Sequence, residues 1–383
     1  MPYTFELSRP DDDPAIRRLL RENPVPGQMA LAYEREPDYF LGSSVMGPLS
    51  QTLVARQETT GDTSGEMGRE TAREVVGEVV GLTTRSVRPL FVNGQVENVG
   101  YIGQLRVDEA HRGRWLVPAG FRLFHRLHQD AAAQGYITTI VEGNTQAEGL
   151  LVEKARRHYP AYRRLERVFT LALIVRRPRR VAAPGVEIRT AAQVELADVI
   201  AFLHREGRRK QFFPVYSAED FTGPATRGLR LDEMAVALQG GKIVGVLALW
   251  DQSAYKQTVV RAYGDNLRRL KPLYNLGAKL LRGQPLTPIG QPIHFAYAAF
   301  ACVAGDDSAL FRPLLQTVYN WAAEHGFAFL MLGLCQGDPL LPVARGWLHI
   351  PYTSALYTVC WQEDEAWRQG LDGRVPYVEI GTL

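Results

Sequence analysis

The chain has 383 residues, more than a typical single domain, so we expect two domains. Lysine and arginine number 44 against 41 aspartate and glutamate, giving a formal net charge of +3. This balance argues against a dedicated nucleic-acid-binding protein, because contacts to phosphates require a concentrated basic surface. The first residues lack a signal-peptide pattern, and no run of roughly 18 apolar residues is available to span a bilayer. We therefore expect a cytoplasmic protein without a membrane partner.

The first half of the chain begins with a short strand, an arginine, an acidic stretch and an amphipathic helix within residues 3–23. Strands near 53–56 and 78–82 then predict a hairpin, in which Gly81 is typical of a bulge or a close backbone approach. Residues 57–74 are rich in Gly, Thr and Glu and are expected to form the hairpin loop. A strand, a helix, a second strand and a last helix follow, over residues 97–107, 115–133, 136–142 and 145–158.

The junction between the long strand and the next helix has a distinctive pattern. The strand covers 101–107, the basic turn runs from His111 to Trp115, and the helix carries apolar residues at helical spacing. Such a turn presents unpaired main-chain N–H groups and the positive end of the helix dipole, which favour a phosphate. Arg112 and Arg114 add charge of the right sign. The pattern predicts a phosphate-bearing cofactor.

The second half repeats this order. Residues 186–206 match 3–23, and strands near 234–238 and 242–246 repeat the hairpin. A strand, helix, strand and helix follow again, over 293–303, 308–325, 327–334 and 338–347. The repeat predicts an N-terminal domain (1–176), a basic linker (177–185) and a C-terminal domain (186–383), the last with an insertion (251–292) and a strand-like tail (375–383).

The cysteines are few and lie only in the second half. Cys302, Cys335 and Cys360 match no zinc-binding spacing, so no metal site is expected, and an odd number suits a reducing compartment. Cys302 and Cys360 lie in apolar strand-like runs. We expect buried, unreactive thiols.

The segment from Val107 to Arg114 resembles the acetyl-CoA signature of the GNAT acetyltransferase superfamily, in which a strand ends before an Arg/Gln-x-x-Gly-x-Gly/Ala turn. Arg112 falls on the leading Arg/Gln. Asn144 and Ala147 match the Asn-x-x-Ala that opens the family's next helix. The element order of both halves is also similar to the GNAT fold. The resemblance implies an α+β protein of two tandem GNAT-like domains, each a mixed, mostly antiparallel splayed sheet flanked by helices.

The resemblance also implies acetyl-CoA as co-substrate, bound in the first half. Trp115 and Val117 stand where the signature has Gly and Gly/Ala, and those small residues normally let the backbone approach the pyrophosphate. In the second half, Asp306 and Asp307 occupy the corresponding turn and would repel a pyrophosphate, so we expect that copy to be degenerate. The residues implied in cofactor binding are Leu105, Arg106, Val107, Arg112, Gly113, Arg114, Trp115, Leu116, Val117 and Asn144.

The catalytic residues are less sharply indicated. Glu142 ends a strand and is a candidate base, with a surface or capping carboxylate as the alternative. The family's usual tyrosine acid is absent, because Leu151 stands there, and Tyr159 or Tyr162 is the candidate replacement unless both simply pack as aromatics. In some tandem GNAT-like enzymes, N-myristoyltransferase among them, the C-terminal carboxylate is the base, which implies that role for Leu383.

These patterns together predict an N-acyltransferase that transfers an acetyl group to an amine of a small molecule or peptide by direct attack on the thioester. The alternative is a non-catalytic module that binds acyl-CoA or a partner protein. Aminoacyl transfer from tRNA by a Fem-like tandem fold conflicts with the near-neutral charge. Edge strands could also pair between subunits in a homodimer.

Overall fold

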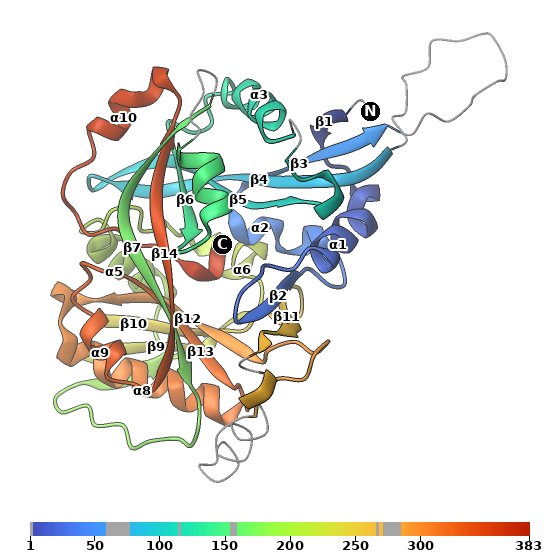
Figure 1. The fold of residues 1–383 in the computed structure, drawn as a ribbon. Helices are drawn as coiled ribbons and strands as arrows, with labels where there is room; N and C mark the ends of the chain where they lie inside the picture. Colours follow the sequence, from blue (N-terminus) through green and yellow to red (C-terminus); the bar gives the residue numbers. More distant parts are fainter. Residues whose placement is uncertain (1–2, 59–76, 114–115, 154–158, 266–267, 271–284) are drawn as a thin grey trace.

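The computed structural model describes residues 3–58, 77–113, 116–153, 159–265, 268–270 and 285–383 (Figure 1). A mixed, mostly antiparallel twelve-stranded sheet, flanked by helices, runs through these residues, in the order β1-β3-β4-β5-β6-β14-β7-β13-β12-β10-β9-β8. The predicted fold class is confirmed, and the size of the chain fits a two-domain arrangement.

The first half contains the elements that the sequence predicts, together with three that it does not predict, the short β2 and α2 and the long strand β7. Helix α1 forms because Ile16, Leu19 and Leu20 share one face and are buried against the sheet. The bounds are β1 (Tyr3–Leu7), α1 (Asp13–Glu22), β2 (Met29–Glu34), α2 (Ser43–Met46), β3 (Leu49–Glu58), β4 (Gly77–Val92), β5 (Gln95–Val107), α3 (Leu116–His128), β6 (Tyr136–Val141), α4 (Thr145–Glu148) and β7 (Ala161–Ile174).

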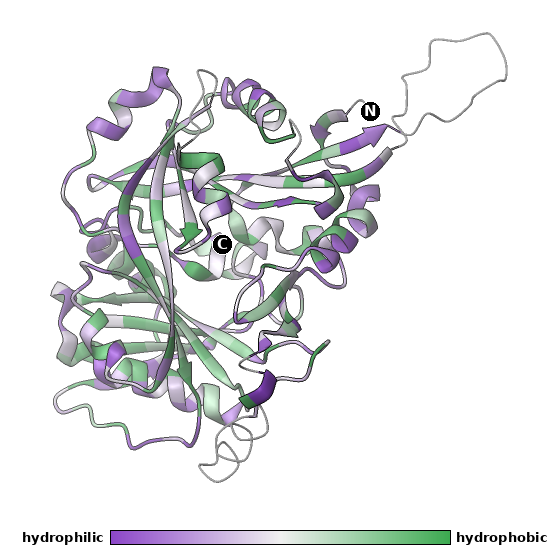
Figure 2. Ribbon diagram, viewed as in Figure 1, coloured by the Kyte–Doolittle hydropathy of each residue, from purple (hydrophilic) through white to green (hydrophobic). Residues whose placement is uncertain are grey.

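The second half repeats the pattern, and its hydrophobic strands β9, β10 and β12 form the larger core with α8 (Figure 2). The bounds are β8 (Glu187–Thr190), α5 (Leu196–Gly207), α6 (Ala218–Thr222), β9 (Leu229–Gln239), β10 (Lys242–Trp250), β11 (Gln257–Tyr263), β12 (Phe295–Val303), α8 (Ser308–Glu324), β13 (Phe329–Cys335), α9 (Leu341–Arg345), β14 (His349–Cys360) and α10 (Glu365–Gln369).

Both predicted hairpins are present. Strands β3 and β4 pair antiparallel with a register shift beside Gly81, and β9 and β10 pair with a shift beside Gly245. Each glycine therefore lies at a bulge, as its position in the strand predicts. Of the predicted hairpin loop, 57–74, residues 59–74 lie outside the described residues.

The two halves exchange their last strands. β14 from the end of the chain lies between β6 and β7 and pairs antiparallel with both, while β7 also pairs with β13 (Figure 1). A two-stranded sheet of β2 and β11 joins the halves a second time. The domain boundary at 177–185 stays a prediction, because the sheet continues across it. Within that segment, Arg179 packs its guanidinium 4.4 Å from the ring centre of Trp347.

The tail differs from its prediction. Instead of a strand, residues 375–383 form one isolated bridge, between Pro376 and Gln211, and a 3-10 turn at Ile380–Thr382. Apolar residues alternate there because the tail is buried between other elements rather than because it joins a sheet. The three cysteines are buried and unbonded, as expected. None of the helices in the described ranges is both long and apolar enough to cross a membrane. The cytoplasmic location stays a prediction.

Candidate acyl-transfer site

Strands β5 and β6 separate soon after they meet. They pair in parallel only at Gly100 with Tyr136 and at Tyr101 with Ile137. Gly100 permits this contact, because a Cβ there would lie 2.0 Å from the Tyr136 ring. Beyond the second pair, β5 continues to Val107 and β6 to Val141. We call the space between these two stretches the first gap. Among the described residues, no strand pairs with the backbone edges that face it, although the Thr138 hydroxyl donates to the Ile102 carbonyl at 2.7 Å.

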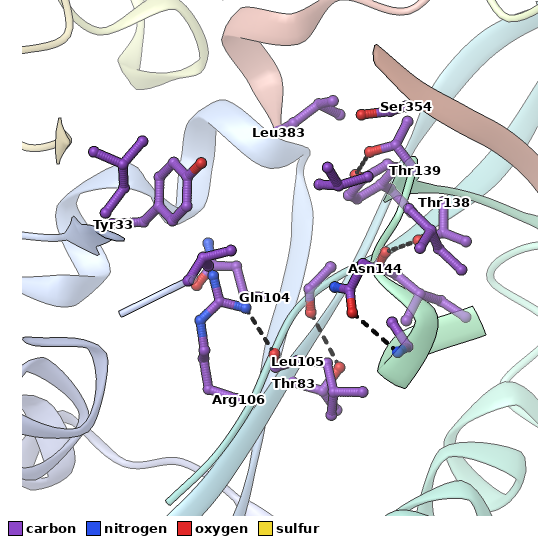
Figure 3. A pocket seen from close by; sticks show the side chains of 18 of the residues that line it. Tyr33, Thr83, Gln104, Leu105, Arg106, Thr138, Thr139, Asn144, Ser354 and Leu383 are labelled. Atoms are coloured by element: carbon purple, nitrogen blue, oxygen red, sulfur yellow. Dashed lines mark hydrogen bonds between the residues drawn. The ribbon is translucent and has the colours of Figure 1, made fainter. Parts of the chain in front are cut away.

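A bulge in β5 lies at the first gap. The register with β4 passes from Thr84–Gly103 to Leu82–Arg106, and Gln104 adopts a φ of 54°. Leu105 packs with the core cluster under α3, whereas the Arg106 guanidinium lies 5.8 Å from the ring centre of Tyr33 on β2. Figure 3 shows Arg106 and Tyr33 on one side and Asn144 on the other. The bulge thus divides the site into two sides.

The second half has the same bulge. Between β10 and β12 the register shifts, and Phe300 adopts a φ of 59°. Strands β12 and β13 also pair briefly, from Phe295 with Phe329 to Tyr297 with Met331. The stretches beyond this pairing border a space that we call the second gap. The repeat predicted in the sequence therefore extends to an irregular backbone feature.

The second gap is filled by the tail of the chain. The Glu379 carboxylate accepts from the Phe300 N–H at 2.8 Å and from the Tyr377 hydroxyl at 2.7 Å. Ile380 packs closely on Gly333, because a Cβ added to Gly333 would lie 2.4 Å from the Ile380 Cγ2 atom. Burial raises the pKa of Glu379. This filling supports the expectation that a cofactor binds in the first half only.

A cavity of about 580 Å³ opens at the first gap (Figure 3). Its wall includes residues of α3, β5 and β6, and also residues of β2, β11 and β14. Both halves therefore shape it. Much of the wall is apolar, with Phe121 and Phe124 from α3 among its residues.

Most of the predicted cofactor residues border this cavity. The Arg112 guanidinium extends back to the Val107 carbonyl (3.3 Å) and the Asn23 side chain (3.4 Å). Gly113 is exposed with a φ of 76°, where an L side chain would be strained. The predicted residues in the cavity wall are Leu105, Arg106, Val107, Leu116, Val117 and Asn144. Arg114 and Trp115 lie outside the described residues.

Asn144 has a structural role in addition to its place in the cavity wall. Its side-chain oxygen accepts from the Ala147 N–H at 3.1 Å and caps α4. The Asn-x-x-Ala pattern in the sequence thus marks the start of a helix beside the cavity. Its role in cofactor binding stays a prediction.

The three catalytic candidates occupy different environments. Glu142 binds Arg164 (2.6 Å) and Arg167 (2.7 Å), which lower the pKa of its carboxyl, and it is not among the described residues of the cavity wall. Tyr159 packs its ring 4.8 Å from that of Phe121 and is likewise not among them. Leu383 lines the cavity.

Leu383 is held by a residue that sequence patterns do not reveal. The Lys256 Nζ lies 2.5 Å from the Leu383 main-chain oxygen, and burial together with the Arg35 charge lowers the pKa of this lysine. Arg35, Lys256 and Tyr352 all border the cavity but carry no motif. They come from β2, β11 and β14 and their neighbours, and these elements meet only in the folded chain.

By sequence, neither a family model nor a curated protein matches this chain. Solved structures do match. A GCN5-related N-acetyltransferase from Sphaerobacter thermophilus is similar over 100% of this chain and 98% of its own, at 13% identity and a TM-score of 0.53. Saccharomyces cerevisiae N-myristoyltransferase with bound myristoyl-CoA is similar over 94% of this chain and 79% of its own, at 12% identity and 0.61.

A third structure is a GCN5-related glucosamine N-acetyltransferase region of a fungal multi-domain β-N-acetylglucosaminidase. It matches over 93% of this chain and 38% of its own, at 12% identity and a TM-score of 0.60. At these identities the likeness shows the fold alone. The chain has the GNAT fold over nearly its whole length, as the sequence resemblance implies.

Proposed function

We propose that this protein is a CoA-dependent N-acyltransferase, with acetyl-CoA as the first donor to test, that transfers the acyl group to an amine of a small molecule or peptide. The observation that carries the proposal is the first gap. Unpaired backbone edges of β5 and β6 line a cavity there. The two amide groups of a pantetheine arm can complete the hydrogen bonds of such edges, as an added strand does.

The diphosphate of the donor binds, in this proposal, where β5 leads into α3. α3 spans thirteen residues and begins beside the cavity, so its N-terminal N–H groups and dipole favour an anion. Arg112 supplies a positive charge, and Gly113 allows a backbone conformation that exposes main-chain N–H groups. Val117, in place of a glycine, lines the cavity wall.

The proposed reaction is direct transfer of the acyl group from the thioester to the acceptor amine. The acceptor nitrogen attacks the thioester carbonyl, a C–N bond forms, the C–S bond breaks, and CoA leaves as a thiolate. Main-chain N–H groups between Leu105 and Val107 stabilise the oxyanion. Tyr162 lines the cavity, and burial raises the pKa of its phenol, so its hydroxyl keeps its proton and donates a hydrogen bond to the leaving thiolate.

The proton of the attacking amine goes to a carboxylate. We favour Leu383 over Glu142, because Leu383 lines the cavity whereas two arginines weaken Glu142 as a base. In this proposal the carboxyl group of Leu383 takes the proton, and the Lys256 Nζ lies 2.5 Å from the Leu383 main-chain oxygen. In this proposal Tyr159 only packs against α3.

The test measures acyl-CoA binding and amine-dependent CoA release separately. Acetyl-CoA and longer straight-chain acyl-CoA thioesters are compared, because the cavity exceeds the size of an acetyl group. Arg112→Glu should weaken acyl-CoA binding by about tenfold or more, through loss of a charge-assisted contact. Arg126→Glu is the matched control, since it makes the same charge change at the exposed far end of α3.

The outcomes separate the two candidate functions. Binding with CoA release supports the transferase. Binding without release over a broad amine panel would leave the non-catalytic acyl-CoA-binding module. Absence of binding by every acyl-CoA tested refutes both, and an equal effect of the two arginine substitutions refutes the placement of the diphosphate.

A further inference from the structure

Three cations converge on one side of the cavity. Arg35, Arg106 and Lys256 all belong to its wall, and no Asp or Glu side chain is among the described residues that line it. Arg35 is only 7% exposed. The Arg106 guanidinium lies 5.8 Å from the ring centre of Tyr33, two residues before Arg35 in the chain, and the Lys256 Nζ lies 5.0 Å from the ring centre of Tyr297 in the same wall.

Two of these cations lack an anionic partner. Within the described ranges, Arg35 and Arg106 form no ion pair, and their recorded side-chain hydrogen bonds go to main-chain carbonyls, those of Glu34 (3.4 Å) and Leu105 (2.8 Å). Isolated buried charges are costly, so such groups are normally paired. Two arginines that face a cavity without an anionic partner therefore indicate a binding site for an anion.

The neighbouring carboxylates do not fill this role. Glu379 acts electrostatically on Lys256, but its oxygens accept from Phe300, Tyr377 and Gly381. The Leu383 main-chain oxygen binds Lys256. Both groups lie at the Lys256 end of the cluster and leave the two arginines uncompensated.

Resting on the proposed function, we propose that the acceptor amine carries an oxyanion, a carboxylate or a phosphate, which Arg35 and Arg106 bind. Both groups match the fork of an arginine. Arg106 lies on the side of the bulge where Tyr33 packs, opposite Asn144, so in this proposal the acceptor binds on the Tyr33 side (Figure 3). Tyr33, Tyr297 and Tyr352 in the same wall supply hydroxyl groups around it.

The position of the cluster also determines how the acceptor is oriented, with its anion and its amine at different places in the cavity. Its anion at Arg106 lies next to the bulge, and its amine reaches the first gap past Gln104. An amino acid is the simplest acceptor that combines an amine with a carboxylate, so it is the first to test. A neutral amine would leave both arginines without a partner and bind weakly.

The experiment compares matched amines. An amino acid, its carboxamide and a phosphorylated amine are tested as acceptors with acetyl-CoA, and N-acetylated forms of the first two are tested for binding by calorimetry. The wild type should prefer an anionic acceptor by about tenfold or more in kcat/KM and in product binding. Arg106→Gln should abolish that preference and lower acceptor affinity more than acyl-CoA affinity.

Arg35→Gln should behave in the same way, and Arg106→Lys should keep part of the preference, since it keeps the charge but loses the fork. Arg312→Gln on the exposed face of α8 is the control and should change nothing. Equal use and equal binding of the amino acid, carboxamide and phosphorylated amine would overturn the inference while leaving the transferase intact.

Two further outcomes would also overturn it. If Arg106→Gln weakens acyl-CoA binding as much as acceptor binding, the arginines hold the phosphates of CoA. If neutral amines are preferred and succinyl-CoA replaces acetyl-CoA as the better donor, the anion belongs to the donor. Binding of the N-acetylated amino acid without any binding of acyl-CoA would instead sustain the anion site and refute the proposed function.

Discussion

Glu379 should be the residue that holds the tail in the second gap. Replacing it with alanine removes the acceptor for two buried donors, the Phe300 N–H and the Tyr377 hydroxyl. It also removes the contact at 3.3 Å that helps to shape the 3-10 turn at Gly381. The tail would lose its anchor, and Leu383 would lose its fixed place at the cavity.

The size of the effect can be worked from these contacts. Each buried donor left without an acceptor costs about 1–3 kcal/mol, and removal of a buried carboxyl returns part of that cost. We expect Glu379→Ala to lower the free energy of unfolding by about 3 kcal/mol. Glu379→Gln can keep an oxygen at the Oε2 position, which accepts from both the Phe300 N–H and the Tyr377 hydroxyl, and it loses only the longer contact to the Gly381 N–H, so its loss should be about 1 kcal/mol.

The pH dependence gives an independent check. Burial raises the pKa of Glu379 in the folded state above its ordinary value of 4.5, so the folded protein keeps a proton that the unfolded chain releases. Stability from this group is therefore complete below the unfolded pKa and decreases as pH rises towards the folded one. Glutamine has no such dependence. The stability difference between wild type and Glu379→Gln should become smaller as pH rises.

The assays are urea unfolding at several pH values and digestion by a carboxypeptidase that removes residues from the C-terminus. Glu379→Ala should unfold at lower urea concentration and lose its tail faster than the wild type. Glu324→Ala, an exposed glutamate at the end of α8, is the control. If Glu379→Ala matches that control in both assays, Glu379 does not anchor the tail.

Two other substitutions test the first half. Gly100→Ala would place a Cβ 2.0 Å from the buried Tyr136 ring and should lower the free energy of unfolding by about 2–3 kcal/mol, measured in urea. Gly373→Ala is the control and should cost little, because no atom lies within 4 Å of its added Cβ. Equal effects of the two substitutions would contradict the tight pairing of β5 and β6. Asp130→Asn removes the carboxylate that binds the fully buried Arg85 at 2.7 Å and should cost about 2 kcal/mol at neutral pH. Because Arg85 lowers the pKa of Asp130, this loss should fade as pH falls through that pKa, and a loss independent of pH would refute the ion pair.

The order of elements could be predicted from the sequence because it depends on local patterns. Apolar residues at helical spacing in α1 and alternating residues in the hairpins specify elements whose contacts lie nearby in the chain. The turn at Arg112 and Gly113 could be located in the same way, because a strand, a basic turn and a helix follow one another directly. The repeat of these patterns then indicated two similar halves.

The site could not be completed from the sequence. Arg35, Arg106 and Lys256 are separated by most of the chain and meet because β2 pairs with β11 beside the β5 bulge. The exchange of β7 and β14 also cannot be predicted from local sequence. Each strand has the same alternation of apolar and polar residues whichever neighbour it pairs with.

The sequence by itself therefore determined the order of most elements, the duplication and a candidate turn for a diphosphate, because these arise from short-range periodicity and turn chemistry. Only the tertiary structure decided that the tail fills one gap and leaves the other open, and that Arg35 and Arg106 face the open one with no Asp or Glu side chain among the described residues of its wall. The reason is physical: burial and charge pairing depend on which distant residues come together, and that is a property of the folded chain.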